Sequence, residues 1–157
     1  MVRCLDIYGE MPSSLLNLQH LRHLDLSNNQ LQGSVPGGIG RLAHIQHLDL
    51  IENQLQGLIL STLGNLSSLN YLSSGSNNFS GEISNLHFSK LSSLDWLDLS
   101  NSNFVFQLDL DWVPPFQLSP YIGKYKSRSK LSILDIYTKV SRNSWLIELE
   151  SFIGRQK

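Results

Sequence analysis

One segment of the sequence recurs with a period of 24 residues. Copies start at Leu18, Leu42 and Leu66, and a fourth starts one residue late at Leu91. The first copy reads L-x-x-L-x-x-L-x-L-x-x-N-x-L-x-G, and most of these positions recur in the next two copies. Such a chain is constrained to fold as a stack of similar turns, because each unit must bury its apolar side against its neighbours.

Each copy contains a short alternation of apolar and polar residues. Leu24 and Leu26 alternate with His23, Asp25 and Ser27, which predicts a strand with one face turned inward. Strands of successive copies are expected to pair into a parallel sheet. An Asn follows each strand and is expected to bond backbone groups that the bend leaves unpaired, at Asn29, Asn53 and Asn77. A Gly then allows a second turn with positive φ, at Gly33, Gly57 and Gly81.

The spacing L-x-x-L-x-L-x-x-N within this period is the leucine-rich-repeat signature. With the tails Gly33-Ser-Val-Pro36 and Gly64-Asn65-Leu66, the pattern resembles the plant extracellular type of repeat. The segment 109–118, which contains Trp112-Val-Pro-Pro115, is similar to plant receptor-like proteins of the fungal-xylanase-receptor type. Those are cell-surface immune receptors with a long repeat ectodomain, one membrane helix and no kinase. The resemblance covers roughly residues 9–136.

The expected fold is an α/β leucine-rich-repeat solenoid. It has a short parallel β-sheet on the concave face, an irregular or 3-10 convex side and an irregular C-terminal tail. We expect a degraded N-terminal repeat, four repeats, and then a basic loop, a partial repeat and a capping helix. The predicted boundaries are 1–17, 18–118 (18–41, 42–65, 66–90 and 91–118) and 119–157.

Composition limits the function classes. The formal net charge of −1 argues against a nucleic-acid-binding protein. Cys4 is the only cysteine, which excludes an internal disulfide. The sequence shows neither a secretory signal nor an apolar run that could span a membrane. Members of the resembling family have both, with a cysteine-paired cap, and are many hundreds of residues long, so we expect an internal fragment.

The outward positions of the strands form the predicted concave face, which is the usual binding face of solenoids. Tyr71 and Trp96 are rigid amphipathic side chains of the kind that anchor interfaces. The candidate ligand-binding residues are His23, Asp25, His47, Asp49, Tyr71, Trp96 and Asp98. The family resemblance implies a protein or glycan ligand on this face, with a co-receptor as a further partner.

Four histidines are expected to form a patch, because the period places His20 beside His44 and His23 beside His47. They could bind a transition metal or respond to pH. The favoured interpretation is that one repeat is a near-copy of its neighbour and carried its histidines along, so no metal is predicted. The sequence contains no phosphate-binding loop, dinucleotide fingerprint or Ser-His-Asp arrangement, and we predict neither catalysis nor a cofactor.

Asn65-Leu-Ser67 and Asn78-Phe-Ser80 are N-glycosylation sequons. The resemblance implies a glycoprotein on the extracellular side of the plasma membrane, acting as a non-catalytic binding module in plant defence. Two alternatives stay open from the sequence. The first is a structural or relic product without a ligand, and the second is a small repeat-type inhibitor of a secreted cell-wall enzyme.

Overall fold

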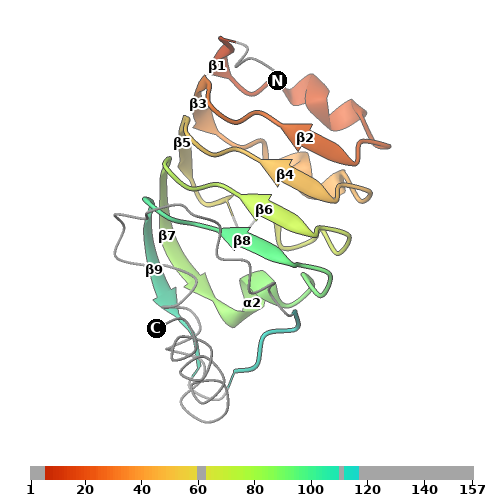
Figure 1. Cartoon of the computed structure of the whole chain (residues 1–157), viewed down its shortest axis with the longest axis vertical. Coiled ribbons are helices and arrows are strands. Elements are labelled where there is room, and N and C mark those ends of the chain that lie inside the picture. Colours follow the sequence, from red (N-terminus) through yellow and green to blue (C-terminus); the bar gives the residue numbers. More distant parts are fainter. Residues whose placement is uncertain (1–5, 60–62, 110–111, 117–157) are drawn as a thin grey trace, which may run out of the picture.

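The computed structural model describes residues 6–59, 63–109 and 112–116. These residues wind as successive turns stacked along one axis, and their strands form two parallel sheets, one of four strands and one of five. Figure 1 shows this arrangement. The predicted leucine-rich-repeat solenoid is therefore confirmed. The predicted basic loop, partial repeat and capping helix within 119–157 lie outside the described residues.

The first sheet contains the short strands predicted from the Leu-x-Leu alternation. Its order is β2 (His23–Asp25), β4 (His47–Asp49), β6 (Tyr71–Ser73) and β8 (Trp96–Asp98), with all strands parallel. The strands pair without a register shift, so equivalent positions of successive copies are neighbours. The central leucines Leu48, Leu72 and Leu97 are fully buried. We call the outward side of this sheet the short-strand face.

A second sheet lies on the other side of the bend. Its order is β1 (Tyr8–Glu10), β3 (Gln30–Ser34), β5 (Gln54–Gly57), β7 (Asn78–Ser84) and β9 (Asn103–Gln107). This second sheet was not predicted, and it adds to the irregular and 3-10 segments expected for the convex side. It forms through a second alternation of period two, in which Leu31 and Leu55 are buried between exposed glutamines. We call the outward side of this sheet the long-strand face.

Short helical segments complete the turns. They are the 3-10 helices η1 (Ser13–Asn17) and η2 (Gly37–Arg41), which confirm the predicted 3-10 segments, and the one-turn α-helix α2 (Asn85–Phe88). The helix α2 begins with a capping box, in which the backbone N–H of Ser84 donates to His87 Nδ1 at 2.9 Å. The described residues contain no helix that combines the length and apolar character needed to cross a bilayer.

The predicted asparagine column holds the turns together. Asn53 Nδ2 donates to the carbonyl of Leu26 in the preceding turn at 2.9 Å, and its Oδ1 accepts from the backbone N–H of Leu31 at 3.0 Å. Asn77 makes the same pair of contacts with Leu50 and Leu55, at 2.8 and 3.0 Å. Each amide thus links its own turn to the backbone of the preceding turn. Asn therefore has a structural role at this position of the repeat.

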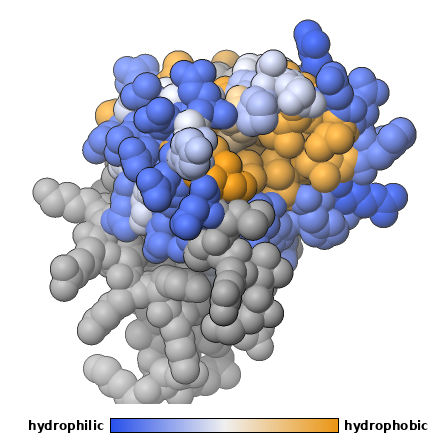
Figure 2. Space-filling model, turned by 90° about the horizontal axis from the view of Figure 1, so that it is seen from above, coloured by the Kyte–Doolittle hydropathy of each residue, from blue (hydrophilic) through white to orange (hydrophobic). Residues whose placement is uncertain are grey.

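The N-terminal end of the stack exposes apolar surface. Figure 2 looks onto this end and shows a hydrophobic area bordered by polar side chains. Several hydrophobic residues at this end are only partly buried, namely Ile7, Leu15, Leu16, Leu21 and Leu26. The equivalents of Leu21 and Leu26 in the next turn, Ile45 and Leu50, are covered on both sides and have exposed fractions of 0%.

Candidate functional site

Four aromatic rings stack across the short-strand face. His23, His47, Tyr71 and Trp96 occupy equivalent positions on β2, β4, β6 and β8. Successive ring centroids lie 5.9, 4.1 and 5.8 Å apart, and the tightest pair, His47 with Tyr71, has an interplanar angle of 10°. This ring column forms because the parallel register repeats one side-chain position every strand spacing of about 4.8 Å.

A carboxylate column runs beside the ring column, two residues further along each strand. It contains Asp25, Asp49, Ser73 and Asp98 in register. The four strands carry three carboxylates and no Lys or Arg. The structure thus brings all seven predicted ligand-binding residues into two adjacent columns on one face. The role of these residues in binding stays a prediction.

The carboxylates differ in environment. Asp25 accepts hydrogen bonds from the side chain and backbone of Ser27 at 2.7 and 3.0 Å, which lowers the pKa of its carboxyl. Burial raises the pKa of Asp49, although that carboxylate accepts from the backbone N–H of Ile51 at 3.1 Å. Tyr71 donates its hydroxyl to Asp49 at 3.4 Å, and burial raises the pKa of Tyr71 to about 12. The phenol therefore stays protonated and able to donate at any physiological pH.

The four predicted patch histidines form two stacked pairs. The rings of His20 and His44 lie 6.0 Å apart, and those of His23 and His47 lie 5.9 Å apart. Within the described part of the chain, no three His, Cys, Asp or Glu side chains come close enough together to hold a metal ion. The two pairs follow from the period of the repeat, as expected from the sequence.

Sequence reasoning did not predict the burial of two groups in the site. Ser73, which the period places among the outward positions, stands in the carboxylate column of the third copy and is buried, with an exposed fraction of 2%. The indole Nε1 of Trp96 is buried and has no hydrogen-bond partner among the described residues. The position of Ser73 can be read from the period, but the environment of the indole cannot, because it depends on how the ring packs.

The two sequon asparagines are both exposed. The side-chain Oδ1 of Asn65 accepts a hydrogen bond from Lys90 Nζ at 2.8 Å. Asn78 is the first residue of β7 and lies on the long-strand face. Both side chains are accessible to a modifying enzyme, and glycosylation at either stays a prediction.

The segment that supported the subfamily resemblance packs against the end of the core. Trp112 stacks on Phe88 of α2 with centroids 5.6 Å apart, and Phe116 meets Phe88 edge-on at 5.8 Å. Asn85 and Asp109 exchange hydrogen bonds, which attach this segment to α2. Trp112 therefore has a structural role in closing the hydrophobic core.

Comparison with known proteins agrees with this architecture. A family model described as leucine rich repeat matches residues 11–55, and no curated protein matches the chain. The structure is similar to the BIR2 ectodomain from Arabidopsis thaliana, with 34% identity over 65% of this chain and 53% of that chain, and a TM-score of 0.61. It is also similar to the plant peptide hormone receptor RGFR1 in complex with RGF2, with 33% identity over 66% of this chain and 16% of that chain, and a TM-score of 0.57.

A third similar structure is a plant ice-binding protein, with 32% identity over 62% of this chain and 31% of that chain, and a TM-score of 0.58. This chain thus spans about half of the BIR2 ectodomain and less of the other two. Because one architecture serves receptors and an ice-binding protein, function has to be argued from the side chains on each face.

Proposed function

The chain is a leucine-rich-repeat protein with the fold of plant receptor ectodomains, and from this premise we propose that it is a non-catalytic module that binds an extended peptide along its short-strand face. The observation that carries the proposal is the pairing of the ring column with the carboxylate column. A peptide laid across the four strands would meet aromatic surface on one side and negative charge on the other.

The two columns favour a peptide with a basic residue next to an apolar or aromatic one. A guanidinium or ammonium group is attracted both to the aromatic faces and to the carboxylates. Asp25, Asp49 and Asp98 supply the charge, and no Lys or Arg on these strands competes for it. The similarity to a receptor described as a peptide hormone receptor in complex with its ligand supports the same class of partner.

Catalysis is not part of the proposal. The pKa values of Asp25 and Asp49 move in opposite directions, as in some acid–base pairs. Asp25, however, lies exposed on an open sheet, and the similar plant structures are described as receptor ectodomains, a receptor complex and an ice-binding protein.

We extend the proposal to location and modification. It places the protein on the extracellular side of the plasma membrane, with N-glycosylation at Asn65 and Asn78, and gives it a role in plant defence, as the fungal-xylanase-receptor resemblance implies.

Selection from a random peptide library tests the function. The chain is immobilised and challenged with displayed 12-residue peptides, in parallel with the variant Asp25→Asn/Asp49→Asn, whose amides keep the size of the carboxylates and one of the two acceptor oxygens of each. We expect enrichment of peptides with Lys or Arg near an aromatic residue on the natural chain, and loss of that enrichment on the variant. The absence of any enrichment, or the same peptides on both surfaces, would refute the proposal and favour the relic interpretation. Inhibition assays on cell-wall glycosidases test the inhibitor alternative separately.

A further inference from the structure

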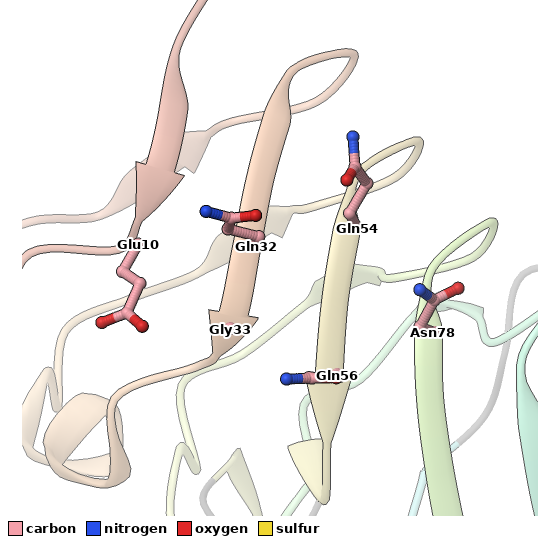
Figure 3. Close-up of a pocket in the computed structure, with 6 residues that line it drawn as sticks. All are labelled: Glu10, Gln32, Gly33, Gln54, Gln56 and Asn78. Atoms are coloured by element: carbon pink, nitrogen blue, oxygen red, sulfur yellow. The ribbon is translucent and has the colours of Figure 1, made fainter.

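The long-strand face carries a shallow groove that the sequence did not predict. Its volume is about 320 Å³, and it lies across β1, β3, β5 and β7. Figure 3 shows side chains from these four neighbouring strands standing around it. The lining consists of Glu10, Gln32, Gly33, Gln54, Gln56 and Asn78. Gly33 helps to keep the groove open, because a Cβ there would approach the Glu10 side chain to 3.2 Å.

The side-chain amides in the groove are available for a ligand. Gln32 pairs in register with Gln54, and Gln56 pairs with Asn78, so donors and acceptors recur at each strand spacing. All four side chains are exposed, and within the described ranges none of their amides bonds another protein group. The buried amides of Asn53 and Asn77 contrast with them, because backbone groups saturate both.

The chemistry of the groove selects a neutral, hydroxyl-rich ligand. An amide side chain donates and accepts at once, which matches neighbouring hydroxyl groups of a sugar. The five strands of this sheet contain no Lys or Arg, and Glu10 adds a negative charge, which disfavours phosphate and uronate ligands. Tyr8 stands next to Gln30 at one end of the sheet with 81% of its surface exposed, and its ring offers a flat apolar platform for a pyranose.

We propose that this groove binds an extended, neutral oligosaccharide of β-linked pyranoses, with Gln32, Gln54 and Gln56 bonding its hydroxyl groups and Tyr8 stacking on a terminal ring. The site is separate from the short-strand face and does not depend on the peptide proposed there. Glycosylation of Asn78 would regulate the binding of this oligosaccharide. Because Asn78 begins a sequon and lines the groove, a glycan attached there occupies the same surface and excludes a free oligosaccharide.

The test uses the whole chain produced in bacteria, which leaves Asn78 unmodified. Cellohexaose and xylohexaose are titrated into it by calorimetry, and the hexamer of galacturonic acid serves as a charged probe. We expect a dissociation constant of about 1 mM or tighter for at least one neutral hexamer and no heat for the charged one. In Gln54→Ala/Gln56→Ala we expect binding to weaken about tenfold or more, because the variant removes two amides that bond the hydroxyl groups of the ligand.

The matched control is His23→Ala/His47→Ala, which removes two rings from the short-strand face and should leave sugar binding unchanged. Thermal unfolding of both double variants shows that they remain folded. Binding of neither neutral hexamer, equal affinity in the glutamine variant, or preference for the charged hexamer would overturn the inference. None of these outcomes affects the peptide selection, which depends on the carboxylate column, so the two proposals fail independently.

Discussion

The side-chain amide of Asn53 donates a hydrogen bond to the backbone carbonyl of Leu26, one turn earlier in the solenoid, at 2.9 Å. The same side chain accepts from the N–H of Leu31 in that earlier turn. A single residue in one copy thus satisfies two backbone groups of its neighbour. The stack is held by this column as well as by its leucines, since a buried group without a partner costs about 1–3 kcal/mol.

Replacing this residue should therefore be costly. We expect Asn53→Ala to lower the free energy of unfolding by about 2–4 kcal/mol, because at least two buried backbone groups lose their partner. Urea denaturation followed by circular dichroism measures the change. Gln54→Ala, at the exposed neighbouring position, should shift stability by less than about 0.5 kcal/mol. Equal midpoints for the two variants would contradict the role given to the asparagine column.

The fourth turn lacks this asparagine, so we expect that introducing it would raise the free energy of unfolding. Ser102 stands at the equivalent position, and its buried hydroxyl has no partner within the described ranges. The preceding residue, Asn101, keeps the positive φ seen before each column asparagine, at 51° compared with 56° at Glu52. We expect Ser102→Asn to stabilise the chain by about 1 kcal/mol by extending the column. Ser102→Ala should be nearly neutral, and a Ser102→Asn variant less stable than the alanine variant would show that the bend cannot accept an amide.

Stability should depend on pH through Asp49. Its pKa is raised from 3.8, chiefly by burial, so the folded state binds the proton more tightly than the unfolded state. The stabilisation from this proton is complete below pH 3.8 and is lost as the pH rises through the folded pKa. Asp49→Asn should therefore be more stable than the natural chain at about pH 7, and this difference should shrink toward about pH 3.

Asp25 should affect the pH dependence of stability in the opposite direction. Hydrogen bonds from Ser27 lower its pKa below 3.8, so its contribution is present above that pH and is lost as the pH falls through the folded pKa. Asp25→Asn should be less stable than the natural chain at neutral pH. Thermal melts from about pH 3 to 7 should give differences of opposite sign for the two variants, and a common sign would contradict the environments described above.

Trp112 should contribute to the stability of the folded chain. Because its ring stacks on Phe88 and contacts Phe116, we expect Trp112→Ala to cost about 2 kcal/mol in the free energy of unfolding. Val113→Ala is the control, since Val113 is 78% exposed. A loss below about 0.5 kcal/mol in urea denaturation would mean that the segment does not close the core.

The sequence predicted the first sheet well, because its period brings Leu24, Leu48 and Leu72 into one column and thereby places His23, His47 and Tyr71 beside one another. It did not predict the second sheet. Gln30-Leu-Gln32 is a very short alternation, and it becomes a strand because β1 and β5 pair with it on its two sides. The groove on that sheet follows from this stacking, and no sequence motif predicts it. The lowered pKa of Asp25 follows from a sequence difference, because Ser27 offers a hydroxyl where Ile51 offers only its backbone N–H. The raised pKa of Asp49 depends on burial, which the local sequence does not show.

The central claim is that the short-strand face binds the ligand, and its most direct test is nuclear magnetic resonance mapping with the peptide recovered most strongly from the library selection. On adding that peptide to the labelled chain, we expect the amide signals of β2, β4, β6 and β8 to shift and those of β3 and β5 to stay in place. Shifts confined to β3 and β5, or shifts of the short strands that persist undiminished in Asp25→Asn/Asp49→Asn, would contradict the claim.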